Sequence, residues 1–367
     1  MLELRSPEGA FERIEAYLRE RGFFVPGGEG LEADVYLGYG LSEPLRRGTS
    51  AAPPEPCPLP LAVVRPRGGD DLVFQEHKRS SVRSTTPSET DLVFQKHKGF
   101  SIGAWERSWS DAEYAAAVRA VRASIERGDV YQVNLVQHLS ATFDGNPAAL
   151  AAALVPFRPV APFLAGDGWA IASASPELFL ARRGRRVWTM PIKGTRPLGM
   201  HVEGEKDEAE HTMIVDLERN DLSRVCEHGS VRWPELMAER ELAGVTHLVS
   251  RVEGTLREKV GLAELLTATF PGGSVTGAPK LAALDEIARL EPVGRGAAMG
   301  ALGVVRGSGD VDLALTIRTF AVADERVHLW VGGGIVWDSD PAAEIEESWT
   351  KAGPLLAAIG APLEVTA

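Results

Sequence analysis

One lysine stands alone in the stretch TMPIKGTRPLG, residues 189–199, among proline and glycine residues that restrict or shape the backbone. A lysine on an open surface needs no such neighbours, whereas a lysine that must direct its amine at one atom of a bound molecule does. An amine positioned in this way can act as a nucleophile. Lys193 is therefore the first candidate for chemistry in this sequence.

A second cation, Arg318, interrupts the stretch LTIRTF, which we interpret as an apolar strand. A guanidinium inside such a strand is costly unless a carboxylate, of the protein or of a ligand, pairs with it. The sequence therefore predicts that Arg318 binds an anion.

Two segments that we expect to be helical carry glutamates. Glu210 opens EHTMIVDLERNDLSR, and Glu344, Glu347 and Lys351 follow one face of the last helix at spacings i, i+3 and i+7. On its own, the second set is more commonly a solvated face with an ion pair. If glutamates from two helices meet over one site, however, their oxygens suit a hard dication such as Mg²⁺.

Two glycine-rich turns complete the set of candidates. FPGGSVTGAPK, residues 270–280, leads into a helix, and the free N–H groups of such a turn can receive an anion. It lacks the lysine spacing of a nucleotide-binding P-loop. VGGGIVWDSD, residues 331–340, ends a strand at a point where the backbone can approach a ligand closely. Each turn is weak support alone, but with the two cations they describe a pocket for an anion.

The composition narrows the class of protein. The 367 residues include 39 basic and 51 acidic side chains, a net charge of −12, which disfavours partnership with nucleic acid or a membrane surface. Cys57 and Cys226 lie far apart, so neither a disulfide framework nor a zinc site is predicted. Residues 1–22 are charged and amphipathic, and no apolar run reaches about 18 residues, so we expect neither a secretory signal nor a membrane span. These features favour a cytoplasmic protein.

The elements that position the candidates are clearest after residue 110, where Ser110 and Glu113 form a capping box. The last helix has Asp340 as its N-cap. Runs of strands with helices that do not alternate strictly predict an α+β fold in one large domain. The expected elements are a helix at 110–128, a strand at 130–143, two strands within 169–195, a helix at 205–226, a strand at 244–257, consecutive antiparallel strands within 297–336 and a helix at 340–360.

The N-terminal part is less regular. A proline-rich connector covers 51–61, and DLVFQEHK at 71–78 recurs as DLVFQKHK at 91–98 around a polar segment. Two copies do not make a repeat architecture, so we interpret 70–98 as a mobile surface insertion. We therefore expect residues 1–105 to be a variable part of the same fold, and residues 106–362 to form the catalytic region.

Taken in order, these motifs resemble the chorismate-utilising enzymes over residues 110–360. The stretches that carry the resemblance include GDVYQVNLVQ, SASPELFL, PIKGTRPLG, EHTMIVDLERNDLSR, FPGGSVTGAPK, TIRTF, GGGIVWDSDP and EIEESWTKA. The resemblance implies the fold of anthranilate synthase component I, in which antiparallel sheets pack as a sandwich with helices outside. It also implies that chorismate is the substrate and that Mg²⁺ holds its ring carboxylate.

The resemblance further assigns roles to individual positions. As catalytic residues it implies Lys193, Glu177 as the general acid that helps the C4 hydroxyl leave, and His247. As metal ligands it implies Glu210, Glu347 and Glu344. As substrate-binding residues it implies Gly194, Thr195, Thr276, Arg318, Gly332, Gly333, Gly334 and Lys351.

Two positions indicate the branch of the family. Members that add water carry a lysine base where this sequence has Gln132, and glutamine cannot take a proton from water. The aminodeoxychorismate synthase branch carries a lysine at the position of Lys193, where anthranilate synthases usually have alanine. The resemblance therefore implies synthesis of 4-amino-4-deoxychorismate, for p-aminobenzoate and folate, through a covalent lysine intermediate. One departure is Ala298, where a tyrosine is common.

Alternatives remain open. No glutamine-hydrolysing module is visible, so ammonia would come from a separate glutamine amidotransferase subunit or from free ammonium. The enzyme alternative is anthranilate synthase component I or another aminating relative. An alternative of a different class is a non-catalytic chorismate-binding regulatory subunit, but such a protein would be expected to have lost Glu177, Glu210 or Glu347, which all remain.

Overall fold

The computed structural model describes residues 1–68, 99–197, 205–242 and 245–361. The insertion expected at 70–98 lies outside these residues, and so do the last six residues of the chain.

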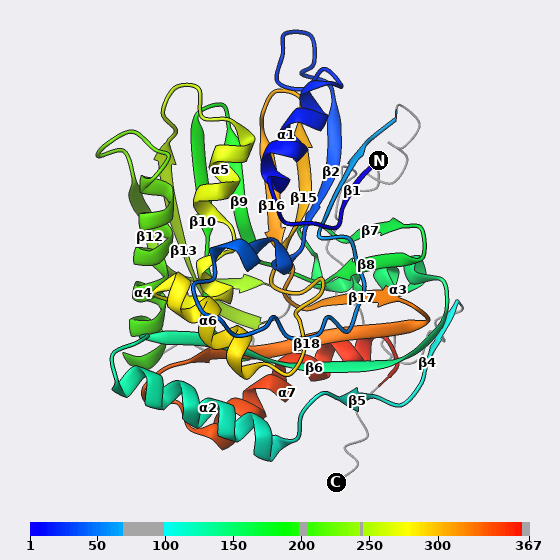
Figure 1. Ribbon diagram of the computed structural model, residues 1–367, viewed down its shortest axis with the longest axis vertical. Coiled ribbons are helices and arrows are strands. Elements are labelled where there is room, and N and C mark those ends of the chain that lie inside the picture. The colour runs from blue at the N-terminus through cyan, green and yellow to red at the C-terminus, as the bar shows by residue number, and fades with distance from the viewer. Residues whose placement is uncertain (69–98, 198–204, 243–244, 362–367) are drawn as a thin grey trace.

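Two antiparallel sheets dominate the described residues, and their strands run crosswise to each other (Figure 1). In spatial order the first sheet contains β1 (Leu2–Leu4), β3 (Ala62–Pro66), β2 (Glu32–Leu37), β15 (Ala301–Arg306), β16 (Val311–Leu315), β9 (Leu178–Arg183), β10 (Arg186–Met190), β13 (Val245–Thr255) and β11 (Ile192–Pro197), with β12 (Arg232–Leu242) paired to β13. The second contains β14 (Gly277–Ala278), β6 (Gln132–Gly145), β18 (Arg326–Ile335), β17 (Thr319–Ala323), β8 (Trp169–Ser173) and β7 (Phe163–Gly166), with β4 (Phe100–Ile102) and β5 (Glu106–Arg107) paired to β6.

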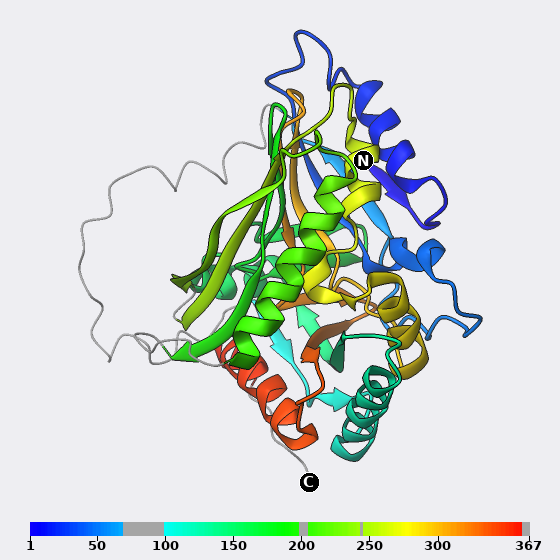
Figure 2. The same ribbon diagram turned by 90° about the vertical axis from the view of Figure 1, so that its left-hand side faces the viewer.

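The helices lie outside the sheets, and Figure 2 shows α1, α4 and α5 along one face of the first sheet. The helices are α1 (Ala10–Arg19), α2 (Asp111–Glu126), α3 (Pro147–Leu154), α4 (Glu205–Ser223), α5 (Leu262–Thr269), α6 (Lys280–Leu290) and α7 (Pro341–Ala358), with 3₁₀ turns at Tyr39–Leu45, Val155–Phe157 and Gly273–Val275. The predicted α+β fold with antiparallel sheets and outer helices is confirmed.

The N-cap residues predicted from the sequence for α2 and α7 are confirmed. The backbone N–H of Glu113 donates to the Ser110 hydroxyl, and the Glu113 carboxylate accepts from the Ser110 N–H at 2.7 Å, so both halves of the capping box form. The carboxylate of Asp340 accepts from the N–H groups of Ala342 and Ala343, each at 3.0 Å, and thereby begins α7.

The strand predictions need correction in two segments, because the chain changes sheets within each of them. Where two strands were predicted within 169–195, the structure has β8, β9, β10 and the start of β11: β8 belongs to the second sheet, whereas β9, β10 and β11 belong to the first. Likewise β16 and β17 are consecutive in sequence but lie in different sheets. Apolar alternation marks a strand but does not say which sheet it joins.

The two crossing segments, 174–177 and 316–318, lie side by side. The N–H of Ala174 donates to the carbonyl oxygen of Arg318, and the N–H of Leu315 donates to that of Glu177, both at 3.0 Å. The prediction that Arg318 lies inside a strand is therefore wrong: it lies in the crossing, with a φ of 50°. A left-handed backbone at a non-glycine residue costs roughly 1–3 kcal/mol and is often found where a side chain serves a site.

Two apolar cores support this arrangement. The larger core joins the first sheet, including β2 and β15, to α1 and α5. The smaller core packs the second sheet under α3 and α7, with Leu139, Phe320 and Leu355 buried in it. Strands β1 to β3 extend the first sheet beside β15, so the N-terminal residues complete the same fold.

Two buried histidines face each other across β6 and β18. His138 Nε2 lies 3.0 Å from His328 Nδ1, and the Ser108 hydroxyl lies 2.6 Å from His138 Nδ1. Burial lowers the pKa of His138 to about 3 and that of His328 to about 4. Both imidazoles are therefore neutral in the folded protein at any ordinary pH.

We expect this pair to make the protein sensitive to acid. Below pH ~6.5 the unfolded chain binds protons that the folded His138 and His328 refuse, so the free energy of unfolding falls, by up to about 1.4 kcal/mol per pH unit for each proton. When the free energy of unfolding is measured with urea at several pH values between 4.5 and 7, it should change less steeply with pH for the double variant His138→Asn/His328→Asn than for the wild type. An equal dependence of the free energy of unfolding on pH in the double variant and the wild type would contradict this prediction. His228→Asn, which replaces an exposed histidine, is the control and should behave like the wild type.

Candidate active site

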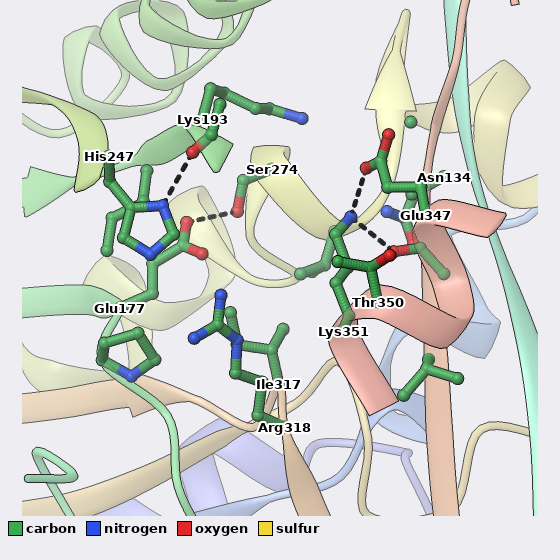
Figure 3. Close-up of a pocket in the computed structure, with 18 of the residues that line it drawn as sticks. Asn134, Glu177, Lys193, His247, Ser274, Ile317, Arg318, Glu347, Thr350 and Lys351 are labelled. Atoms are coloured by element: carbon green, nitrogen blue, oxygen red, sulfur yellow. Dashed lines mark hydrogen bonds and ion pairs between the residues drawn. The ribbon is translucent and has the colours of Figure 1, made fainter. Parts of the chain in front are cut away.

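A cavity of about 670 Å³ opens where the two sheets meet. Residues of both sheets, of α4 and of α7 line it, together with the crossing segments. Figure 3 shows His247, Lys193, Glu177 and Ser274 on one side and Glu347 and Lys351 on the other. The predicted site residues that line this cavity are Glu177, Lys193, Gly194, Glu210, His247, Arg318, Gly332, Gly333, Gly334, Glu347 and Lys351.

Glu177 is a buried carboxyl at the cavity wall, only 4% exposed. The Ser274 hydroxyl donates to its Oε1 at 2.7 Å. Burial raises the pKa of Glu177, while the Ser274 hydrogen bond and the charge of Lys193 oppose the rise. A carboxyl that keeps its proton toward neutral pH can act as a general acid.

Lys193 lies on β11 at an irregular point in its pairing with β13. The register shifts between Lys193 and Arg196, and Gly194 has a φ of 61°, which glycine adopts without strain. His247 Nδ1 donates to the carbonyl oxygen of Gly194 at 2.7 Å and holds this loop in place. The Lys193 side chain is 13% exposed, and its Nζ lies 4.0 Å from Glu210 Oε2.

The hydrogen bond to Gly194 also fixes the state of His247. Since the carbonyl can only accept, Nδ1 carries a proton, and in the neutral imidazole Nε2 is then an acceptor. Burial lowers the pKa of His247 to about 4, and the charges of Arg318 and Lys351 act in the same direction. His247 is therefore a neutral group that positions the Lys193 loop.

Arg318 reaches the cavity from the crossing segment. Within the part of the chain that the structure describes, it has no ion-pair partner. Burial lowers the pKa of Arg318, opposed by the charge of Glu177. A guanidinium held in this way is suited to a bidentate pair with a carboxylate of a ligand.

The glycine run on β18 brings backbone close to its neighbours. A Cβ at Gly332 would lie 1.9 Å from the carbonyl oxygen of Leu135. Lys351 Nζ donates to the Gly332 carbonyl at 2.9 Å and lies 2.7 Å from Glu347 Oε1. The ion pair expected on α7 is thus present; both of its residues line the cavity, and the Glu347 side chain is 51% exposed.

The carboxylates fit a Mg²⁺ ion by type. A Cβ at Gly333 would lie 3.3 Å from Glu347 Oε1, 3.4 Å from Lys351 Nζ and 3.5 Å from Glu344 Oε2, so both carboxylates and the Lys351 amine approach the space that the glycine leaves. Glu210 and Glu347 line the same cavity from α4 and α7. Among the described residues no cluster of three or more His, Cys, Asp or Glu is arranged around one ion, but Mg²⁺ binds through one or two carboxylates plus waters and substrate.

Two predicted site residues, Thr276 and Glu344, do not line the cavity. Thr276 is fully buried and does not line the cavity; its hydroxyl donates to the carbonyl oxygens of Gly272 and Gly273 and so shapes the glycine turn. Glu344 is 4% exposed and reaches Gly333 from behind the cavity wall. The side chain of Thr195 lies outside the described part of the structure.

Two further positions singled out in the sequence are buried. Gln132 is fully buried, and neither atom of its amide has a hydrogen-bond partner among the described residues. A Cβ at Gly334 would lie 2.4 Å from its Nε2. Ala298, 1% exposed, packs in the larger core beside the cavity residue Met299.

Sequence reasoning missed several residues of the cavity wall. Ser274, which holds Glu177, carried the only available signal, since it follows two glycines in a motif already singled out. Asn134 points inward from a strand whose residues are mostly buried on both faces, so its role had no pattern to reveal it. Met299, Ile317 and Trp330 are among the other missed residues.

A cavity that joins a buried carboxyl to three cations and a glycine-lined wall defines an enzyme-like site for an anionic small molecule. The chain belongs to the chorismate binding enzyme family, whose family model matches residues 68–357. This confirms the resemblance inferred from the motifs. No described helix has both the length and the apolar character needed to cross a membrane.

Named relatives come from two branches. The chain is 41% identical over 266 residues to aminodeoxychorismate synthase component 1 of Klebsiella aerogenes, covering 69% of this chain and 59% of the relative. It is 40% identical over 270 residues to anthranilate synthase component 1 of Streptomyces coelicolor, covering 70% and 53%. The chain thus spans between half and three-fifths of the length of these relatives.

A solved structure supports the fold. Anthranilate synthase component I of Streptococcus pneumoniae superposes with a TM-score of 0.71 at 26% identity, covering 89% of this chain and 81% of that one. The expected anthranilate synthase-like fold is therefore confirmed.

Proposed function

We propose that this protein converts chorismate and ammonia to 4-amino-4-deoxychorismate, with Lys193 as a covalent nucleophile. The observation that carries the proposal is the placement of Lys193: its amine lines the same cavity as the buried acid Glu177, on a loop that His247 holds. The aminodeoxychorismate synthases among its relatives supply the substrate class. Gln132 at the position of the water-activating lysine favours ammonia over water as the second nucleophile.

The proposed reaction has two displacements. Once its ammonium proton has passed to solvent, the amine of Lys193 forms a bond to ring carbon C2, the ring double bonds shift, and the C4–O bond breaks as Glu177 donates its proton to the departing hydroxyl, releasing water. Ammonia then bonds to C4, the double bonds shift back, and the C2–N bond to Lys193 breaks. The Glu177 carboxylate regains a proton from the added nitrogen. Covalent catalysis divides one difficult substitution into two easier steps.

The remaining residues bind and orient the substrate. Arg318 would pair with the enolpyruvyl carboxylate, with Gly332 to Gly334 leaving room beside it. Glu210 and Glu347 would hold a Mg²⁺ ion, which when bound supplies positive charge to the ring carboxylate. The ammonia would come from a separate glutamine amidotransferase subunit or from ammonium.

A second candidate is anthranilate synthesis. Two anthranilate synthase relatives favour it, at 40% and 41% identity to this chain. They are as similar to it as the aminodeoxychorismate synthases are. In that reaction ammonia itself would attack C2, and Lys193 would serve only to bind substrate.

The deciding experiment is to incubate the protein with chorismate, Mg²⁺ and ammonium and to identify the product by mass spectrometry, before and after adding a lyase that releases p-aminobenzoate. Our proposal expects p-aminobenzoate only after the lyase is added. Anthranilate without the lyase would favour the second candidate. Binding of chorismate with no product, even with an amidotransferase subunit and glutamine, would indicate a non-catalytic protein.

The metal assignment gives a separate prediction. Glu347→Gln removes one negative ligand, so we expect Mg²⁺ affinity in the presence of chorismate to fall by about tenfold or more, measured by calorimetric titration. Glu126→Gln, on the exposed end of α2, is the matched control and should bind Mg²⁺ like the wild type. Equal affinity of Glu347→Gln and the wild type would remove Glu347 from the metal site.

A further inference from the structure

His211 is a buried polar side chain that the proposed reaction does not use. It follows Glu210 on α4 and is fully buried, whereas Glu210 lines the cavity. Successive residues of a helix point about 100° apart around its axis. This turn of α4 therefore presents Glu210 to the cavity on one side and carries His211 into the protein on the next.

The hydrogen-bond partner of His211 is Ser250 on β13, which is also fully buried. His211 Nε2 lies 2.5 Å from the Ser250 hydroxyl oxygen. Among the described residues, the other ring nitrogen, Nδ1, has no hydrogen-bond partner. The bond to Ser250 is therefore the contact that fixes the imidazole.

Ser250 also joins α4 to two strands besides its own. Where β12 pairs irregularly with β13, the N–H of Met237 donates to the Ser250 hydroxyl at 2.9 Å. The N–H of Ser250 donates to the carbonyl oxygen of Pro191 at 3.2 Å, just before β11 begins. Because β11 carries Lys193, this serine links the helix of Glu210 to the strand of the proposed nucleophile.

The link lies at the point where α4 first enters the protein interior. The side chains of Glu208 and Ala209 are exposed, and His211 is the first buried residue among the described side chains of α4. Glu210, next to it, lies with its Oε2 4.0 Å from Lys193 Nζ. The anchor of His211 thus acts on the turn from which Glu210 reaches the cavity.

We propose that His211 is a positioning residue: its hydrogen bond to Ser250 holds this turn of α4 against β13 and so places the Glu210 carboxylate for Mg²⁺. The inference rests on the proposed function, in which Glu210 is a metal ligand. Mg²⁺ demands nearly octahedral geometry, so displacement of one carboxylate weakens its binding. His211 does not line the cavity and acts only through the position of Glu210.

The test is the affinity for Mg²⁺, measured by calorimetric titration in the presence of chorismate. His211→Leu removes the hydrogen bond from α4, and Ser250→Ala removes it from β13. Each should bind Mg²⁺ about tenfold more weakly than the wild type, as is typical when a group that orients a metal ligand is lost. His211→Gln, whose amide nitrogen can take the place of Nε2, should retain most of the affinity. Wild-type affinity in folded His211→Leu and Ser250→Ala proteins would overturn the proposal.

The double variant His211→Leu/Ser250→Ala shows whether the two residues act through one bond. If they do, its Mg²⁺ affinity should be no lower than that of either single variant, because the bond is already lost. If the two losses multiplied instead, the residues would act independently, and the proposed role of their hydrogen bond would be wrong.

Thr189→Val is the matched control. The Thr189 hydroxyl on β10 donates to Glu218 Oε2 at 2.9 Å, so this variant also removes one hydrogen bond between α4 and the first sheet, about two turns further along the helix. It should lower thermal stability as Ser250→Ala does, yet bind Mg²⁺ like the wild type. Equal weakening of Mg²⁺ binding would indicate a general loosening of α4, and the proposal would fail.

The titration needs no turnover, so it separates this inference from the proposed reaction. If chorismate is bound but not converted and the variants show the expected affinities, the proposed reaction fails and the positioning role stands. If the wild type converts chorismate but the variants bind Mg²⁺ normally, only the positioning role fails. A wild type that binds no Mg²⁺ would overturn both the metal assignment and this inference.

Discussion

Replacing Arg318 with lysine is expected to lower kcat/KM for chorismate about 100-fold, because a charged hydrogen-bonded pair contributes roughly 1.5–3 kcal/mol. Lysine keeps the positive charge but loses the planar fork that grips both oxygens of a carboxylate. The crossing segment aims this fork from a left-handed backbone, and among the described residues no protein carboxylate forms an ion pair with it. Steady-state kinetics with chorismate and ammonium measure the effect.

The backbone of Arg318 supplies the control. Glycine adopts a φ of 50° without strain, so Arg318→Gly should be at least as stable to heat as the wild type while also losing activity. Loss of activity with stability retained separates ligand binding from folding. A change in kcat/KM below about twofold in Arg318→Lys would mean that the arginine only supports the crossing segment.

The features that could be predicted from the sequence are those set by neighbours in the chain. The helix caps at Ser110 and Asp340 depend only on a few neighbouring residues of the sequence. The glycine run 332–334 is needed because the backbone there approaches its neighbours too closely for a side chain. The motif resemblance then grouped Glu177, Lys193 and other distant residues into one site, which spacing alone does not do. The cavity that these residues line agrees with that grouping.

The features that could not be predicted depend on the packing of the sheets. Alternation in 169–195 and 297–336 is the same whichever sheet a strand joins, so the crossings that carry Glu177 and Arg318 went unrecognised. Thr276 lies in the right motif, but its hydroxyl turns inward to the glycine turn.

The crossings also explain why the site lies where it does. Backbone hydrogen bonds continue through the crossings: the N–H of Ala174 donates to the carbonyl of Arg318, and the N–H of Leu315 donates to that of Glu177. The two segments that carry the acid and the guanidinium are therefore held together by their main chains. Lys193 comes from the separate β11–β13 pairing and Lys351 from α7. A substrate between them contacts both sheets and two helices, which restricts its orientation before any reaction begins.

Replacing Lys193 with alanine is expected to lower C4 amination at least 100-fold and to divert the residual turnover toward anthranilate. The resemblance implies that Gln132 stands where water-adding relatives have a lysine base, and glutamine cannot take a proton from water, so we expect the first attack on C2 to come from Lys193 or from ammonia. Lys193 is held at the cavity by the pairing of β11 with β13 and by the hydrogen bond of His247 to Gly194. Without the amine, ammonia is left to add directly at C2.

The competing interpretation is that Lys193 only supplies positive charge, as its 4.0 Å separation from Glu210 Oε2 would allow. Lys193→Arg separates the two, because arginine keeps the charge but is a poor nucleophile. A nucleophilic role predicts that this variant is as inactive in C4 amination as Lys193→Ala, whereas a charge role predicts that it retains activity. Lys259→Ala, at an exposed lysine, should behave like the wild type.

A covalent adduct provides the direct measurement. When the wild type is mixed with chorismate and no ammonia, the first displacement can occur but the second cannot, so intact-protein mass spectrometry should show the mass of chorismate less water on the peptide that contains Lys193. The adduct should disappear when ammonium is added and should be absent from Lys193→Arg. Absence of any adduct, together with a Lys193→Ala protein that makes the C4-aminated product at the wild-type rate, would show that the lysine is no nucleophile and that ammonia acts alone.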